Sequence, residues 1–213
     1  AERLLCLDQL SGGRAMFGMG RGLAKMEYER FGIDMNEARE RFDEAADVIT
    51  RALETGIVDS KGKFYGKPFP IEIRPRPRKT CKGRTSCAAM SSDTVPAAAQ
   101  TGAAMLAFGA RPWEDMVPVV NNYRTLYQQH HAGPVPDPIF CNFLFCDENS
   151  ERAWEMAHKY VTRYYDSLMK HYEMAGSHFK HIKGYGDYAK GAELLQEEAE
   201  LARKRHEFVG YND

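Results

Sequence analysis

Two positions in the sequence place side chains suited to an anion directly after short apolar runs. Arg21 stands between two glycines after the first run. Ser91, Ser92 and Thr94 follow a second run and open an Ala-rich helix. A guanidinium makes forked, charge-assisted hydrogen bonds to a phosphate, and a helix N-terminus adds free backbone N–H groups and a positive dipole end. These residues therefore predict an anion site, with phosphate as the ligand that matches best.

Each of these residues also has a simpler interpretation. Arg21 suits an ion pair with a surface carboxylate, and the hydroxyl groups suit ordinary N-capping of the helix. Asp93 counts against an anion, because it brings a like charge to the same helix end. From the residues alone, anion binding and these structural roles both stay open.

The sequence lacks the motifs typical of other kinds of functional site. The seven histidines form no H-x-x-x-H or H-E-x-x-H pattern, so we expect no metal site. There is no G-x-S-x-G elbow and no P-loop, and residues 18–23 lack the third glycine of the dinucleotide fingerprint. Residues 61–84 hold nine basic residues, one acid and interleaved aromatics, a pattern that could bind single-stranded nucleic acid. We favour a solvated, proline-rich hairpin there.

Composition restricts the class of protein further. The 213 residues contain 29 Lys and Arg against 30 Asp and Glu, and this net charge of −1 favours neither nucleic acid nor an anionic membrane. Hydrophobic residues make up 43%, and no apolar run approaches the roughly 18 residues of a membrane-spanning helix. The five cysteines form no C-x-x-C pair, and no signal pattern opens the chain. We expect a reduced, globular, cytoplasmic protein without nucleic-acid or membrane partners.

Apolar strands and amphipathic helices alternate along the chain and would position these residues. After a first helix at 1–10, the pattern predicts strands at 14–20, 86–90, 104–108 and 139–146. Each strand precedes a helix, at 35–55 behind a capping box at 34–37, at 91–102, at 113–131 and from 149 or 150 onward. A parallel connection needs room for a helix, so this order predicts an α/β fold with a parallel sheet. Four such units cannot close an eight-stranded barrel, and a doubly wound sheet is the other possibility.

The segment LDQLSGGRAMFGMGRGLAKMEYERFGIDMNEARERF resembles the bacterial luciferase-like flavin monooxygenases. In that family, D-x-x-S-x-G-R is followed by a strand, R-G and a phenylalanine-glycine before a long helix. The likeness continues through SCAAMSSDT, MLAFGARPW, NFLFCDE and KGYGDYAKG, in the second half by pattern more than by letters. It implies part of a TIM (β/α)8 barrel, with about four βα units over 1–175. Residues 176–213 would form a polar helical tail that leads to the family's lid.

The resemblance also implies site residues. The family binds FMN at the strand ends and holds its phosphate with arginines, hydroxyls and backbone amides. By position, the arginines are Arg21 and Arg39, and the hydroxyls are those of Ser91 and Thr94. Met90 would contribute a backbone amide where the luciferase alpha chain has an acidic residue. No catalytic acid or base can be named, because the family's histidine near the flavin belongs to strands that precede this segment.

The resemblance implies a flavin-dependent oxidoreductase of which this chain is an internal fragment, inactive by itself. Reduced FMN from a separate flavin reductase would react with dioxygen and oxygenate an organic substrate such as an aldehyde or hydrocarbon. The full-length protein would form a homo- or heterodimer. Two alternatives stay open: a non-catalytic flavin-binding protein with an incomplete barrel, and a deazaflavin-dependent oxidoreductase of the same fold.

Overall fold

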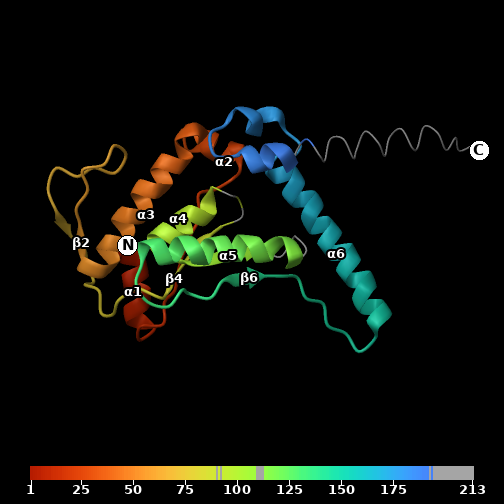
Figure 1. The fold of residues 1–213 in the computed structure, drawn as a ribbon, viewed down its shortest axis with the longest axis horizontal. Coiled ribbons are helices and arrows are strands. Elements are labelled where there is room, and N and C mark those ends of the chain that lie inside the picture. Colours follow the sequence, from red (N-terminus) through yellow and green to blue (C-terminus); the bar gives the residue numbers. More distant parts are fainter. Residues whose placement is uncertain (90, 92, 109–112, 192, 194–213) are drawn as a thin grey trace, which may run out of the picture. The chain divides into compact units, whose positions relative to one another are not determined.

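A parallel sheet of four strands organises much of the chain. The computed structural model describes residues 1–89, 91, 93–108, 113–191 and 193 (Figure 1). Its parallel strands lie in the order β1 (Phe17–Met19), β4 (Thr85–Ala88), β5 (Ala104–Phe108) and β6 (Ile139–Cys141). Their spatial order follows the chain order, as in a barrel, whereas a doubly wound sheet reverses its order at a switch point. The predicted partial TIM barrel is therefore confirmed.

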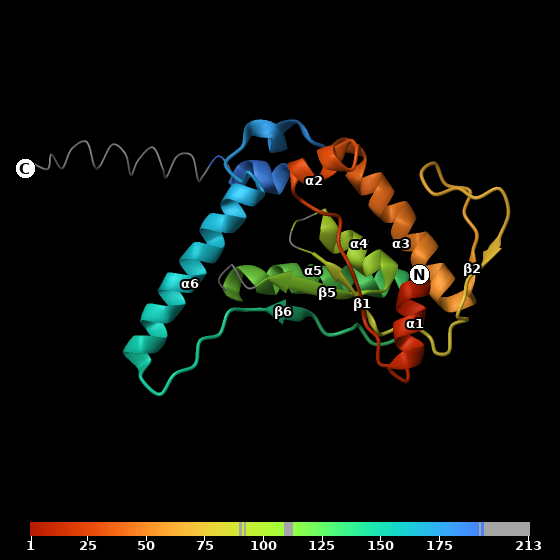
Figure 2. The same cartoon turned by 180° about the vertical axis from the view of Figure 1, so that it is seen from behind.

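Helices cover one face of this sheet and build the core with it. α3 (Ala38–Thr55), α4 (Thr94–Thr101) and α5 (Trp113–His130) are the successive crossovers. Because parallel crossovers are right-handed, strands that follow chain order carry their helices on one side. α4 packs on β4 and β5 and lies between α3 and α5 (Figure 2). Buried side chains from both layers meet there, among them Met19, Cys87, Val95, Met105 and Tyr123.

Two helix ends follow directly from glycines in the sequence. Gly56 ends α3 with φ of 74°, and Gly102 ends α4 with φ of 73°. Glycine adopts this left-handed backbone conformation without steric strain, whereas a residue with a Cβ atom would be strained there. Both ends agree with the predicted ones, because the signal that sets them is local.

Two other predicted boundaries are wrong for reasons that lie in the neighbouring structure. Asp34 does not form the expected capping box; its carboxylate accepts the N–H of Asn36, and the short 3-10 helix η1 (Met35–Glu37) precedes α3. β6 ends at Cys141 instead of residue 146. Cys141 pairs with Phe108, the last described residue of β5.

The proline-rich hairpin contains two short strands that the sequence did not reveal. β2 (Ile57–Val58) and β3 (Ile71–Glu72) pair antiparallel. Their loop is fastened to α3 by Glu44, whose carboxylate accepts the backbone N–H of Phe64 at 3.0 Å and of Tyr65 at 2.6 Å. These bonds lower the pKa of Glu44, although its desolvation acts in the opposite direction. The loop therefore has a fixed conformation against the helix.

The chain divides into two compact units. The first comprises residues 1–22 and 37–142 and holds the sheet. The second comprises residues 23–36 and the described residues from 143 onward. These limits differ from the division expected at residue 175, and most of the expected polar tail lies outside the described residues.

The second unit has an aromatic interior that the sequence analysis missed. Its helical elements include α2 (Lys25–Arg30), α6 (Ser150–His171) and η2 (Ser177–His181). Asn149 is one of the two residues predicted to begin α6. It caps this helix by accepting hydrogen bonds from the backbone N–H groups of Glu151 and Arg152. Phe179 and Tyr185 are each 1% exposed, with ring centroids 6.1 Å apart. The polar composition of this region hid these two core residues.

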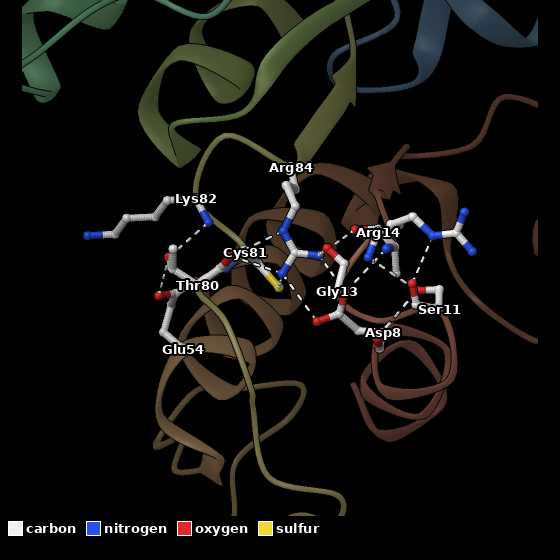
Figure 3. Close-up of polar contacts among 10 residues, drawn as sticks. Asp8, Ser11, Gly13, Arg14, Glu54, Thr80, Cys81, Lys82 and Arg84 are labelled. Carbon is white, nitrogen blue, oxygen red and sulfur yellow. Dashed lines mark hydrogen bonds and ion pairs between the residues drawn. The ribbon is translucent and has the colours of Figure 1, made fainter.

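A buried ion pair joins α1 (Glu2–Leu10) to the turn before β4 (Figure 3). The Asp8 carboxylate is 2% exposed and accepts hydrogen bonds from both terminal nitrogens of Arg84, Nη2 at 3.2 Å. Arg84 also donates to the carbonyls of Gly13 and Ala15, at 3.3 and 2.8 Å. The hydrogen bonds from Arg84 lower the pKa of the Asp8 carboxyl, against the effect of its burial. The pair therefore fastens α1 and the loop after it to the start of β4.

We expect Asp8→Ala to lower the free energy of unfolding by about 3 kcal/mol at pH 7, because it leaves a partly buried guanidinium without its counter-charge. Urea denaturation measures this difference. Because the folded pKa of Asp8 is lowered, the pair stabilises the fold above the unfolded carboxyl pKa of about 3.9, and this contribution is lost as the pH falls through the folded pKa. The difference should therefore shrink in strong acid. Asp47→Ala, which removes an exposed pair with Arg51, is the control; equal losses in both variants would contradict the assignment.

Candidate functional site

The pairing of β1 with β4 brings the predicted anion-binding residues to one edge of the sheet. Met19 pairs with Cys87, so the carboxyl ends of these adjacent parallel strands meet. Arg21 lies two residues beyond β1, and Ser91 lies three residues beyond β4. Arg21 is half-buried, and its Nη1 atom is inaccessible to solvent. The structure thus places Arg21 and the Ser91–Thr94 turn at the same carboxyl edge, as predicted.

The two predicted hydroxyls shape the turn that begins α4. Thr94 Oγ1 accepts the N–H of Ser91 at 3.0 Å and lies 2.9 Å from the Ser91 carbonyl, to which it donates. The two hydroxyl oxygens are 3.2 Å apart, and the residues are 5% and 8% exposed. Asp93, at the N-cap position, makes no capping hydrogen bond with its side chain. The Ser91 and Thr94 hydroxyls therefore organise the loop at the start of α4, and the Asp93 side chain does not cap this helix.

Arg39 reaches this turn from a different helix. It lies in the first turn of α3, and its side chain is 17% exposed. Nη2 donates to the carbonyl of Asp93 at 2.9 Å, and Nη1 is 3.5 Å from a carboxylate oxygen of Asp43. A guanidinium has five N–H groups, so these two contacts leave donors for an anion at the same place. Arg39 and the turn, 54 positions apart in sequence, are therefore brought together.

Two of the residues named for this site lie outside the described part of the chain. They are Met90, expected to contribute a backbone amide, and Ser92. Their neighbour Cys87 is buried in the core, and burial raises the pKa of its thiol to about 11. That thiol stays protonated near neutral pH, so it is not a nucleophile at this edge.

A cavity of about 510 Å³ lies at the opposite edge of the sheet. Its lining includes Thr85, which begins β4, and Gly102, which precedes β5, so it is at the amino ends of the strands. His131 stands in its wall with Nε2 2.9 Å from the carbonyl of Ala99, near the end of α4. Sequence reasoning gave no sign of this cavity, because residues far apart in the chain form it. It is separate from the predicted anion site.

The described residues hold neither a metal-binding cluster nor a membrane-spanning helix. No group of three His, Cys, Asp or Glu side chains is arranged to hold a metal ion. None of the helices in this part of the chain combines the length and apolar content that crossing a bilayer requires.

Comparison with known proteins identifies the family. The sequence profile described as "Luciferase-like monooxygenase" matches residues 1–211. The chain belongs to this family. The alkanal monooxygenase alpha chain of Photobacterium leiognathi is 27% identical over 168 residues, which are 78% of this chain and 47% of that protein. A beta chain from Photorhabdus luminescens is 31% identical over 128 residues, 60% of this chain and 38% of its own length. This luciferase-like chain thus spans about half the length of the curated relatives it matches.

Solved structures share the fold of this luciferase-like chain. The monooxygenase RslO1 from Streptomyces bottropensis superposes with a TM-score of 0.70 at 23% identity, over 80% of this chain and 53% of that one. The coenzyme F420-dependent tetrahydromethanopterin reductase from Methanopyrus kandleri gives a TM-score of 0.53 at 20% identity, over 90% and 60% of the two chains. At these identities the likeness establishes the barrel fold alone.

We expect Thr94→Val to destabilise the fold by about 1–3 kcal/mol, because the buried N–H of Ser91 loses its acceptor. Thr94→Ser keeps the hydroxyl and should stay close to the wild type in urea denaturation. Equal stability of the Val and Ser variants would show that this hydroxyl does not organise the turn.

Proposed function

We propose that this chain forms the phosphate-binding part of an FMN-dependent monooxygenase. The phosphate would lie at the edge formed by Arg21, Arg39 and the Ser91–Thr94 turn. The observation that supports this best is the 2.9 Å hydrogen bond from Arg39 to the carbonyl of Asp93. It brings a second guanidinium to the loop after β4, and β4 pairs with β1, the strand that Arg21 follows.

The charges at this edge fit a phosphate only when both arginines take part. A phosphomonoester carries nearly two negative charges near neutral pH, which two guanidiniums would neutralise. Asp93 and Asp43 oppose this, and Asp43 already lies 3.5 Å from Arg39. The start of α4 adds a partial positive charge to the balance. Removing either arginine should therefore weaken binding. The amide of Met90 remains part of this proposal.

The residues of this chain would bind and orient the cofactor. When bound, reduced FMN supplies the reaction with dioxygen that oxygenates an organic substrate such as an aldehyde or hydrocarbon. Contacts to the phosphate are equal in the ground state and the transition state, so they lower the dissociation constant without accelerating chemistry. The arginines are accordingly assigned to binding.

Partners and compartment follow from the same proposal. A separate flavin reductase would supply the reduced flavin. Similarity to both an alpha and a beta chain supports subunit association in the whole protein. The free cysteines, Cys6, Cys81, Cys87, Cys141 and Cys146, suit the reducing cytoplasm.

A deazaflavin-dependent oxidoreductase is the second candidate function. The observation that favours it is the barrel shared with an F420-dependent reductase. Titration of the chain with FMN and with F420 distinguishes the two, because the tighter ligand identifies the cofactor class.

Comparing FMN with riboflavin tests the proposed site directly, because riboflavin lacks the phosphate. Arg21→Ala should weaken FMN binding by about 1.5–3 kcal/mol, the range for hydrogen bonds to charged groups, and leave riboflavin binding unchanged. Fluorescence titration measures both dissociation constants. Arg51→Ala, at the other end of α3, is the matched control. The control should keep the FMN affinity of the wild type. If Arg21→Ala also keeps it, the assignment is contradicted.

A further inference from the structure

The cavity at the amino edge of the sheet has the size of a small-molecule site. Its volume of about 510 Å³ lies within the range of about 300–1,000 Å³ that is usual for such sites. The last turns of α3, α4 and α5 and the turn before β4 form its walls. These elements all belong to the first compact unit, so the cavity is formed within one unit.

Two buried hydroxyl groups line this cavity without a hydrogen-bond partner among the described residues. Thr85 is 8% exposed at the start of β4, and Tyr127 is 9% exposed near the end of α5. The neighbouring Tyr123, by contrast, donates to the carbonyl of Ala103 at 2.8 Å. A buried hydroxyl is normally paired, so these two groups favour a bound molecule that supplies their partners.

His131 adds a hydrogen-bond acceptor on a fixed ring. Its Nε2 atom lies 2.9 Å from the carbonyl of Ala99 and 3.1 Å from that of Gln100. Carbonyls only accept, so Nε2 carries the proton and Nδ1 of the neutral ring is an acceptor. The ring lies against Gly102, where a Cβ atom would be 3.2 Å from Cε1, and its centroid is 4.7 Å from that of Tyr127. Two rings thus line the cavity, and aromatic rings attract a further ring through stacked or edge contacts.

Two further buried side chains add apolar surface to the lining. Leu53 is completely buried, and Cys81 is 6% exposed. Burial raises the pKa of the Cys81 thiol, which therefore stays protonated near neutral pH. A protonated, buried thiol behaves as a small apolar group.

The charges around the cavity favour an anion at its exposed rim. Glu54, the acid of the lining, already accepts the backbone N–H of Cys81 at 2.6 Å. Lys82 is exposed and has no carboxylate within 4 Å among the described residues, and its side chain extends away from the neighbouring ion pair (Figure 3). Arg51 is shared with Asp47 at 2.8 Å and has further N–H groups to donate. The negative ends of the helices oppose an anion deeper inside.

We propose that this cavity binds a small aromatic acid that also carries a hydroxyl group. The aromatic ring packs against the rings of Tyr127 and His131. The hydroxyl group bonds with the buried hydroxyls of Thr85 and Tyr127 and with Nδ1 of His131. The carboxylate lies at the rim, with Lys82 and Arg51. This site is at the amino ends of the strands and the proposed phosphate site is at their carboxyl ends, so the inference is independent of the proposed function.

NMR titration of the 213-residue chain with 4-hydroxybenzoate tests this inference. Gly83 and Gly102 line the cavity, whereas Gly20 and Gly22 follow β1 at the opposite edge. We expect saturable shifts of the amide signals of Gly83 and Gly102, and none at Gly20 and Gly22. Benzoate lacks the hydroxyl and 4-hydroxybenzyl alcohol lacks the carboxylate, so each should bind about fivefold more weakly or worse.

Two variants separate the contacts of the hydroxyl from those of the carboxylate. Tyr127→Phe should weaken 4-hydroxybenzoate about fivefold and leave benzoate unchanged. Lys82→Gln should weaken both acids and leave 4-hydroxybenzyl alcohol unchanged. Lys67→Gln, at an exposed cation outside the lining, is the control and should leave all three affinities unchanged. Tyr127→Phe should also keep the wild-type stability in urea, because its hydroxyl has no partner among the described residues.

Four results would overturn this proposal. One is the absence of saturable shifts at Gly83 and Gly102, and another is shifts confined to Gly20 and Gly22. The third is equal weakening of benzoate and 4-hydroxybenzoate by Tyr127→Phe. The fourth is a loss of stability in Tyr127→Phe as large as that in Tyr123→Phe, which removes a paired hydroxyl.

Discussion

The position of Arg84 at the entry to two strands determines much of the geometry in the first unit. Its guanidinium binds Asp8 and the carbonyls of the loop after α1, and its own carbonyl accepts the N–H of Phe17 at 2.9 Å. Phe17 begins β1 and the residue after Arg84 begins β4, so this clamp fixes the register in which the two strands pair. Register matters because a slip of one residue would turn every side chain to the other face.

The candidate site depends on that register. With Met19 opposite Cys87, the loops after β1 and β4 begin at the same edge, and Arg21 and Ser91 lie in these loops. The crossover through α3 then returns Arg39 to the turn, and hydrogen bonds within the turn hold its shape. The candidate site would thus combine two loops with the first turn of α3. The nearby carboxylates of Asp43 and Asp93 would weaken the binding of an anion there.

The sequence predicts those features whose signals are local. Alternating apolar runs and helices predict the parallel sheet, and glycines at 56 and 102 predict two helix ends. Arg21 and the hydroxyls are predicted as site residues because strand ends carry sites in such folds. The Asp8–Arg84 pair spans 76 positions and follows no periodicity, and Arg39 binds a backbone carbonyl that any residue could present. Two-residue strands such as β2 and β3 are too short for a pattern.

A crystal structure of the chain with FMN would test the central claim most directly. The account predicts phosphate oxygens within hydrogen-bond distance of the guanidiniums of Arg21 and Arg39, at the carboxyl edge of β1 and β4. It also predicts that the Ser91–Thr94 turn keeps its conformation around the phosphate. A phosphate seated in the cavity at the amino edge, beside His131, with no ligand near Arg21, would contradict it.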